Sequence, residues 1–199
     1  GLEPFGEMPA LVENQAVWRL SPDETGDDMI LRKIDNPFQH HGGLTVFKGT
    51  LGEAVMKTSA IKDRHLIVEA PAVVFEDQDD LLTAYKAGEL EKDFVAVIRY
   101  QGPKANGMPE LHKLTPSLGV LQDKGFKVAL VTDGRMSGAS GKVPAAIHVT
   151  PEAASGGAIA RVKNGDIVRV DAPTGELLVL VDEAEFDART PSSGPTVLD

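Results

Sequence analysis

A glycine-rich loop with several polar side chains follows an apolar stretch at 128–131. The polar residues are Asp133, Arg135, Ser137, Ser140 and Lys142. The glycines, which let a backbone approach a ligand closely, are Gly134, Gly138 and Gly141. Hydroxyl, carboxylate and cationic groups gathered after a strand are suited to bind an anion or to move a proton. We therefore interpret 133–142 as a functional loop, because a merely structural turn requires fewer polar side chains.

Three common loop motifs do not match this segment. A phosphate-binding P-loop would need a glycine and a hydroxyl where the sequence has Met136 and Val143. A nucleophile elbow around Ser137 would need flanking glycines, but Arg135 and Ala139 stand there. The spacing of the glycines also differs from that of a dinucleotide-binding fingerprint. The residues alone therefore assign no specific mechanism to the loop.

The elements around this loop are expected to bring a second polar loop beside it. Apolar residues at 94–100 predict a buried strand, and leucines spaced by three and four predict a helix over 109–124. With the strand predicted at 128–132, this is the order and length of a crossover between parallel strands. The loops 101–110 and 133–142 should therefore lie at the same edge of one sheet.

Several polar residues in these loops also have ordinary structural interpretations. Glu110 can be a solvated acid favoured by the helix dipole, and the dipeptide at 106–107 can form a simple turn. Asp133 can hold its loop by accepting backbone hydrogen bonds, an interpretation that we favour over a chemical role. Arg135 and Lys142 can pair with nearby acids or face solvent as readily as they bind an anion.

Histidine and cysteine are not expected to form a metal centre within this chain. The sequence has no cysteine, so it supplies no disulfide, no cysteine nucleophile and no thiolate ligand for zinc or an iron–sulfur cluster. The side chains of His40 and His41 would diverge and make a poor metal site. His65 and His148 are interpreted as structural, and His112 as a surface or capping residue.

Composition predicts a soluble, cytoplasmic, globular protein. The chain has 199 residues, 42% of them hydrophobic, and a net charge of −10, which disfavours nonspecific binding to nucleic acid or to an anionic membrane. No apolar run has the length of a membrane span, and the amino end does not resemble a signal peptide. The opening Gly1-Leu-Glu-Pro4 is unlike a natural start with methionine, so we expect an amino-terminal portion to be missing.

The two ends of the chain are expected to lie outside a single domain at 43–190. Residues 1–42 contain four prolines, which predict an extended arm or linker with at most a short helical turn at 29–34. Trp18 is expected to be a packing residue, with anchoring of the arm on another surface as the alternative. A flexible tail is expected at 191–199.

Between these ends, short β-favouring stretches and few helices predict a mixed α/β domain. The further strands expected are 44–47, 54–58, 66–69, 72–75, 145–149, 158–162, 166–171 and 176–181. Helices are also expected around 81–87 and over 183–189, and Pro116 is expected to disturb the longer helix. The dipeptides at 164–165 and 174–175 are hairpin signals between the last strands.

Five segments within 43–186 resemble the carboxyl-terminal domain of the dihydroxy-acid dehydratase and phosphogluconate dehydratase family. They are 48–51, 54–59, 69–75, 101–114 and 131–152. The runs Gly102-Pro-Lys-Ala-Asn-Gly-Met-Pro-Glu-Leu-His-Lys113 and Met136-Ser-Gly-Ala-Ser-Gly-Lys-Val-Pro144 are similar to the phosphogluconate branch of that family. Thr50 departs from the asparagine that the family usually has, with little expected consequence.

The resemblance implies a swivelling β/β/α domain of the α/β class, with a barrel-like mixed sheet and few helices. It also implies dehydration of 6-phosphogluconate to 2-keto-3-deoxy-6-phosphogluconate in the Entner–Doudoroff pathway, by a dimeric enzyme. Family members use an iron–sulfur cluster, usually 4Fe-4S in this branch, whose cysteines lie in an amino-terminal domain. The present chain would need that domain as a partner and would be inactive alone.

The family's roles carry over to matching positions in this sequence. Ser137 would be the alkoxide base that removes the proton at C2, and Glu110 would ligate a magnesium ion that binds the substrate carboxylate. A serine hydroxyl is too weak an acid for this role unless a nearby metal stabilises its alkoxide. Further substrate-binding candidates are Lys104, Asp133, Arg135, Gly138, Ser140 and Lys142. The alternatives are another sugar-acid or dihydroxy-acid dehydratase and a noncatalytic docking domain.

Overall fold

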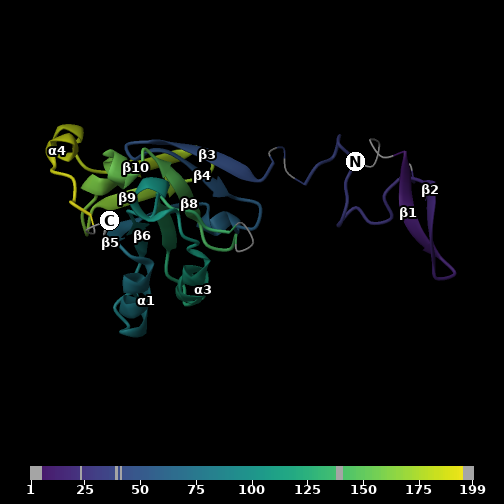
Figure 1. The fold of residues 1–199 in the computed structure, drawn as a ribbon, viewed down its shortest axis with the longest axis horizontal. Helices are drawn as coiled ribbons and strands as arrows, with labels where there is room; N and C mark the ends of the chain where they lie inside the picture. Colours follow the sequence, from purple (N-terminus) through teal and green to yellow (C-terminus); the bar gives the residue numbers. More distant parts are fainter. Residues whose placement is uncertain (1–5, 23, 39, 41, 138–140, 195–199) are drawn as a thin grey trace. The chain divides into compact units, whose positions relative to one another are not determined.

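The computed structural model describes residues 6–22, 24–38, 40, 42–137 and 141–194. The chain divides into two compact units, 1–42 and 43–199, which are described separately (Figure 1). None of the helices in the described part of the chain has the length and apolar character needed to traverse a bilayer.

The first unit contains a β-hairpin, which the sequence analysis did not predict. Strands β1 (Glu7–Val12) and β2 (Gln15–Leu20) pair antiparallel through a two-residue turn. Both turn residues, Glu13 and Asn14, have positive φ, as a hairpin of this length requires. A hydrogen-bonded turn lies at 28–30, at the start of the segment predicted as a helical turn, where the amides of Ile30 and Leu31 donate to the carbonyl of Asp27. The predicted packing role of Trp18 is not seen within this unit, where its side chain is 70% exposed.

The second unit is a closed eight-stranded barrel with helices outside it. Its order is β10-β3-β4-β8-β7-β6-β5-β9. The strands are β3 (Leu44–Gly49), β4 (Gly52–Lys57), β5 (Ile67–Phe75), β6 (Phe94–Ile98), β7 (Val128–Thr132), β8 (Ala145–Thr150), β9 (Ile167–Asp171) and β10 (Glu176–Val179). The run β5-β6-β7-β8 and the pair β10-β3 are parallel, and the remaining pairs are antiparallel. This architecture confirms the predicted barrel-like mixed sheet.

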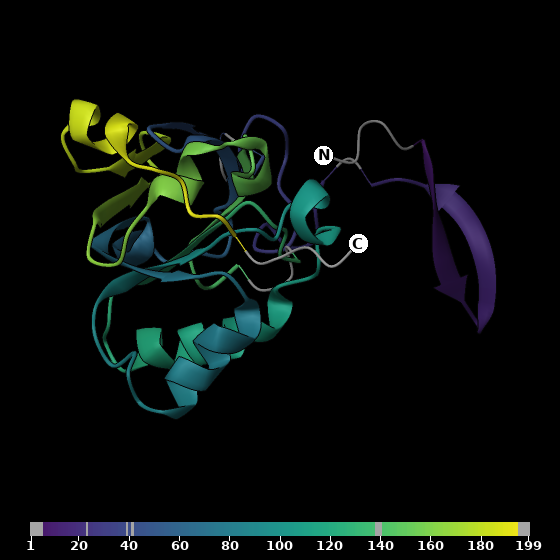
Figure 2. The same cartoon turned by 60° about the vertical axis from the view of Figure 1, so that its left-hand side comes forward.

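Four α-helices accompany the barrel within the described residues: α1 (Gln78–Lys86), α2 (Pro103–Asn106), α3 (Thr115–Asp123) and α4 (Glu183–Ala188). Helices α1 and α3 lie on the same side of the barrel (Figures 1 and 2). There are also short 3-10 helices, namely η1 (Asp63–His65), η2 (His112–Leu114), η4 (Ala153–Ser155) and η5 (Ala158–Arg161). The predicted helices around 81–87 and over 183–189 are confirmed.

Two apolar cores explain why the sequences of the central strands β6 and β7 are continuously apolar. Alternate residues of β6 and β7, such as Val97 and Val131, pack inside the barrel. The residues between them, such as Leu130, pack under α1 and α3 against Leu81 and Leu118. Strands β6 and β7 are therefore buried on both faces, which removes the polar alternation of a half-exposed strand.

Two predicted strands, 66–69 and 72–75, are one strand in the structure. Strand β5 runs through Pro71, which is the last residue paired with β9, and from Ala72 onward it pairs with β6. The residue without an amide hydrogen thus stands where the strand changes partner. Proline is tolerated at such a position because no continuous ladder is broken there.

The predicted strand at 158–162 is wrong, and this segment is the 3-10 helix η5. The chain turns tightly just before it: Gly156 has φ of 80°, and a Cβ on Gly157 would lie 1.8 Å from the carbonyl oxygen of Pro151. Ile159 and Ala160 are apolar because they face the barrel core rather than because they alternate in a sheet. The hairpin predicted at 164–165 is therefore absent, whereas the one at 174–175 joins β9 and β10.

The predicted helix over 109–124 is shorter than expected. It begins at Thr115, after the 3-10 turn η2, so Pro116 lies in the first turn of α3 and does not disturb the helix interior. Residues 103–106, predicted as loop, form the single turn α2. The parallel crossover itself is confirmed, because β6 and β7 pair parallel from Phe94–Val128 to Ile98–Thr132.

The first part of the predicted flexible tail contacts the barrel. The Ser192 amide donates to the carbonyl of Ala160 at 2.9 Å, and its hydroxyl lies 2.5 Å from Glu76 Oε1. The Tyr100 hydroxyl also donates to the Ser192 carbonyl. Residues 195–199 lie outside the described part of the chain.

Helix α3 should stabilise the crossover through its buried leucines. We expect Leu118→Ala, at a fully buried position, to lower the free energy of unfolding by about 2–5 kcal/mol. Val120→Ala, on the same helix but 42% exposed, is the control and should change it by less than about 0.5 kcal/mol. Urea denaturation of both variants measures the difference. Equal effects would contradict the described packing of α3.

Candidate active site

The two polar loops meet at one edge of the barrel, as the crossover predicts. Glu110 and Arg135 form an isolated parallel β-bridge between them, beyond the carboxyl ends of β6 and β7. The amide of Leu111 donates to the carbonyl of Arg135 at 3.1 Å. The backbone therefore joins residues that are far apart in the sequence.

The carboxylate of Glu110 organises the exposed part of this edge. Its Oε1 accepts hydrogen bonds from the amides of Ser137 at 2.7 Å and His112 at 3.1 Å. Its Oε2 lies 2.9 Å from Nη1 of Arg135, whose Nε donates to the Met108 carbonyl. Because α3 begins only at Thr115, the interpretation of Glu110 as a first-turn helix acid is wrong.

Ser137 is exposed and borders a small cavity of about 30 Å³. The cavity is also lined by Lys57, Met136, Gly141, Val143, Ala145 and Ile147. This volume, among the described residues, is close to that of one water molecule in the liquid.

Asp133 is buried and holds the loops together. Its side chain accepts amide hydrogens from Tyr100 at 3.1 Å, Gln101 at 2.9 Å and Ala153 at 2.9 Å. Burial raises the pKa of the Asp133 carboxyl, and these amide donors, which favour the ionised form, oppose the rise. With a residue exposure of 1%, Asp133 has the loop-holding role that the sequence analysis favoured rather than one in direct contact with substrate.

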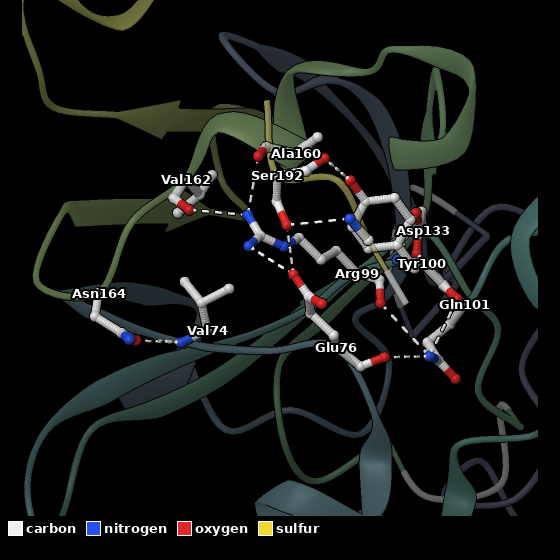
Figure 3. Close-up of polar contacts among 11 residues, drawn as sticks. Val74, Glu76, Arg99, Tyr100, Gln101, Asp133, Ala160, Val162, Asn164 and Ser192 are labelled. Carbon is white, nitrogen blue, oxygen red and sulfur yellow. Dashed lines mark hydrogen bonds and ion pairs between the residues drawn. The ribbon is translucent and has the colours of Figure 1, made fainter. Parts of the chain in front are cut away.

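A polar network beside Asp133 fixes the start of the first loop (Figure 3). Gln101 donates to the carbonyls of Glu76 and Tyr100, and Tyr100 has φ of 60°, a strained conformation that the two amide bonds to Asp133 help to stabilise. Arg99 donates to the carbonyl of Ala160 and to Glu76. These residues position the site and do not reach its exposed edge.

Glu152 is a second anchor that the sequence did not single out. Its carboxylate accepts the amides of Lys104 at 3.0 Å and Ala105 at 3.3 Å, in the first turn of α2. A Cβ on Gly102 would meet this carboxylate at 2.1 Å, so the turn requires glycine there. The only signal for Glu152 was its place in a family-like segment.

The remaining residues predicted to bind substrate differ in their surroundings. Lys104 is exposed on α2, and Lys142 donates to both oxygens of Asp123 at 2.6 and 2.7 Å. This hydrogen bond from Lys142 lowers the pKa of Asp123. Gly138 and Ser140 lie outside the described residues. The structure therefore brings Glu110, Arg135 and Ser137 together and places Lys142 in a separate ion pair.

His65 lies among basic residues. His65 accepts a hydrogen bond from Nε of Arg64, and burial, followed by the neighbouring cations, lowers its pKa. Within the ranges that the structure describes, no group of three or more histidine, aspartate and glutamate side chains is arranged to hold a metal ion. Among the described residues, Glu110 is therefore not part of a ready-made group of three such metal ligands.

A closed mixed barrel whose parallel strands end at a serine, a carboxylate and an arginine is typical of an α/β domain built to bind a polar ligand at one edge. Comparison with known proteins is more specific. The family model for the dihydroxy-acid/6-phosphogluconate dehydratase C-terminal domain matches residues 29–197. The chain therefore belongs to the dihydroxy-acid/6-phosphogluconate dehydratase family.

Relatives from several bacteria and an archaeon match nearly the whole chain. It is 60% identical over 195 residues to a phosphogluconate dehydratase of Pseudomonas aeruginosa, with 98% of this chain and 32% of the relative covered. The corresponding Escherichia coli K12 protein is 57% identical, with 96% and 32% covered. A dihydroxy-acid dehydratase of Ignicoccus hospitalis is 42% identical, with 94% and 34% covered. The chain thus spans about a third of the length of these relatives.

Gly134 permits the close approach of the two loops. A Cβ there would lie 2.7 Å from Cβ of Gln101 and 3.1 Å from Cδ1 of Leu111. We expect Gly134→Ala to lower the free energy of unfolding by about 1–3 kcal/mol, because these buried groups must move apart. Gly119→Ala, which meets no atom within 4 Å on helix α3, should instead raise it by about 0.5–1 kcal/mol. Urea denaturation compares the two, and a neutral Gly134→Ala would contradict the described loop contact.

The anchoring role of Asp133 can be tested with asparagine. Asp133→Asn places a donating NH₂ where one carboxylate oxygen accepted an amide, so we expect a loss of about 1–3 kcal/mol in unfolding free energy. Asp77→Asn is the control, because the exposed Asp77 caps α1 by accepting the Asp79 amide and asparagine caps equally well. Thermal and urea unfolding give the measurement. Wild-type stability in Asp133→Asn would rule out the anchor.

Proposed function

We propose that this chain is the carboxyl-terminal part of a phosphogluconate dehydratase, a hydro-lyase that converts 6-phospho-D-gluconate to 2-keto-3-deoxy-6-phosphogluconate and water. The observation that carries the proposal is the 2.7 Å hydrogen bond from the Ser137 amide to Glu110, which joins a hydroxyl residue and a carboxylate at one open edge. Support also comes from the identity of 53–60% to proteins named phosphogluconate dehydratase, against 42% to a dihydroxy-acid dehydratase.

The reaction requires a base at C2 and removal of the hydroxyl at C3. In the proposed roles, the Ser137 oxygen, as an alkoxide, takes the C2 proton, and the C3 hydroxyl leaves as hydroxide. The proton and the hydroxide together make the water that is released, and the remaining enol tautomerises to the keto acid. Serine needs positive charge nearby to ionise near neutral pH. The Glu110 carboxylate beside it is negative, so on its own it would oppose the alkoxide; Arg135 compensates Glu110 in part.

The residues present fit a magnesium ion as a partial site. Magnesium prefers oxygen ligands and is often held by one or two carboxylates together with water and substrate. Glu110 supplies such a carboxylate, and it is about one-third exposed, so it is accessible from the open edge. When bound, the ion would supply positive charge that stabilises an alkoxide and a substrate carboxylate.

An iron–sulfur cluster would have to be held by other protein. The sequence has no cysteine, and the relatives are about three times as long as this chain. We propose that a 4Fe-4S cluster lies in an amino-terminal part of the same polypeptide, where it would supply a Lewis acid for the departing hydroxyl. That part would be the main partner of this domain, in a cytoplasmic homodimer.

A different dehydratase of the family is the second candidate, because the Ignicoccus hospitalis relative acts, by its name, on a dihydroxy acid. The two candidates differ in whether the substrate carries a phosphate. Turnover by the full-length protein of 6-phosphogluconate, D-gluconate and 2,3-dihydroxyisovalerate separates them.

Removing either proposed group should abolish turnover of 6-phosphogluconate by the full-length protein. We expect Ser137→Ala and Glu110→Gln to lower kcat by at least about 100-fold, as is typical for loss of general base catalysis. Ser117→Ala, at a serine within helix α3, is the matched control and should keep full activity. Pyruvate-coupled or semicarbazide detection of the keto acid gives the rate.

The iron–sulfur content of each variant and the magnesium dependence of the wild type should be measured together with these rates. Iron and sulfide content should be equal in all variants, and magnesium removal should impair the wild type. Normal turnover in Ser137→Ala or Glu110→Gln, at unchanged cluster content, would show the proposed roles to be wrong.

A further inference from the structure

A group of cationic side chains lies near Ser137, apart from the Glu110–Arg135 pair. Lys57 ends β4 and lines the small cavity together with Ser137 and Gly141. The segment that follows β4 packs against the same loop, because a Cβ on Gly141 would lie 2.9 Å from Cβ of Ala60. This segment carries Lys62 and Arg64, and Lys142 follows Gly141 directly.

Two neighbouring side chains, His65 and Asp123, are each affected by Lys62, Arg64 and Lys142. His65 has its pKa lowered by burial and then by the charges of Arg64, Lys62 and Lys142. Asp123 has its pKa lowered first by its hydrogen bond to Lys142, with Lys62 and Arg64 also contributing. The residues that surround this point therefore come from the β4–β5 segment, the end of α3 and the loop after β7.

The four cations at this surface outnumber its two acids, Asp63 and Asp123. Asp123 pairs with Lys142, and in the described part of the chain no ion pair of Lys62 or Arg64 is present. Both side chains belong to exposed residues. Gathering like charges costs folding free energy, and the chain as a whole has a net charge of −10. A local positive surface in such a chain is suited to an anionic ligand.

Other cations near the loops are less suited to a second anion. Arg135 is engaged by Glu110, at the place where the proposed metal and substrate carboxylate would bind. Lys104 lies on α2, whose first-turn amides already hold the Glu152 carboxylate, and this negative charge would repel a phosphate. Lys62 and Arg64 remain, with Lys57 near them and with Lys142, which also binds Asp123.

We propose that Lys57, Lys62, Arg64 and Lys142 form a subsite for the phosphate of a phosphorylated sugar acid whose reacting carbons lie at Ser137. This inference rests on the proposed function. A phosphate monoester carries nearly two negative charges and is recognised by lysine and by the planar fork of arginine. The substrate carboxylate would lie toward Glu110 and Arg135, and the phosphate, at the other end of the carbon chain, toward the cations.

The test is the double variant Lys62→Gln/Arg64→Gln in the full-length protein. Both residues are exposed, so folding should be preserved. We expect KM for 6-phosphogluconate to rise about 10- to 100-fold with kcat nearly unchanged, because charge-assisted contacts to the phosphate are lost. The inhibition constant of inorganic phosphate should rise in parallel. Unphosphorylated D-gluconate, as a substrate or a competitive inhibitor, should be unaffected.

Lys86→Gln/Lys92→Gln is the matched control, because it removes the same charge from exposed positions on α1 and before β6. It should leave all constants within about twofold of the wild type. An unchanged KM in the test variant, or an equal loss for D-gluconate, would overturn the subsite. If the wild type fails to dehydrate 6-phosphogluconate, the proposed function is wrong instead. Calorimetric binding of inorganic phosphate to wild type and variant then still decides whether the cations bind phosphate.

Discussion

The buried carboxylate of Asp133 is the contact on which the geometry of this edge depends. It binds amides that follow β6 and an amide that follows β8, while itself following β7. Three neighbouring strand ends are therefore tied to one side chain. Because the carboxylate has little water around it, each of these amides would be costly to leave unpaired. The loops that carry Glu110 and Ser137 depart from this fixed point.

This arrangement separates polar groups that hold the fold from those that remain accessible. Asp133 and Glu152 are used by backbone amides, and Gln101 is enclosed in the network around Arg99. The groups left at the surface are the partly exposed Glu110 carboxylate with Arg135, the Ser137 residue and the cations near it. A rigid base with exposed chemistry at the strand ends is how α/β domains commonly form binding sites.

The sequence predicted the parts of this fold that depend on local pattern. The apolar runs of β6 and β7 and the crossover between them are enough to predict that Glu110 lies near Ser137. The strand prediction for 158–162 was wrong because burial of Ile159 and Ala160 gives the same apolar pattern in a 3-10 helix as in a strand. Closure of the barrel, the anchor Glu152 and the approach of Lys62 to the site depend on contacts distant in sequence, which no local pattern encodes.

The acidity of the chain does not oppose an anionic substrate at this edge. Charges beyond about 8 Å are largely screened at physiological ionic strength, so the distant acids that give the net charge of −10 contribute little. Nearby charges decide the local field, and these differ along the edge, with Glu110 beside Arg135 and with Lys62, Arg64 and Lys142 near one another. In the proposed arrangement this difference would bind a sugar acid phosphate in one direction, and the direction would fix which carbon faces Ser137.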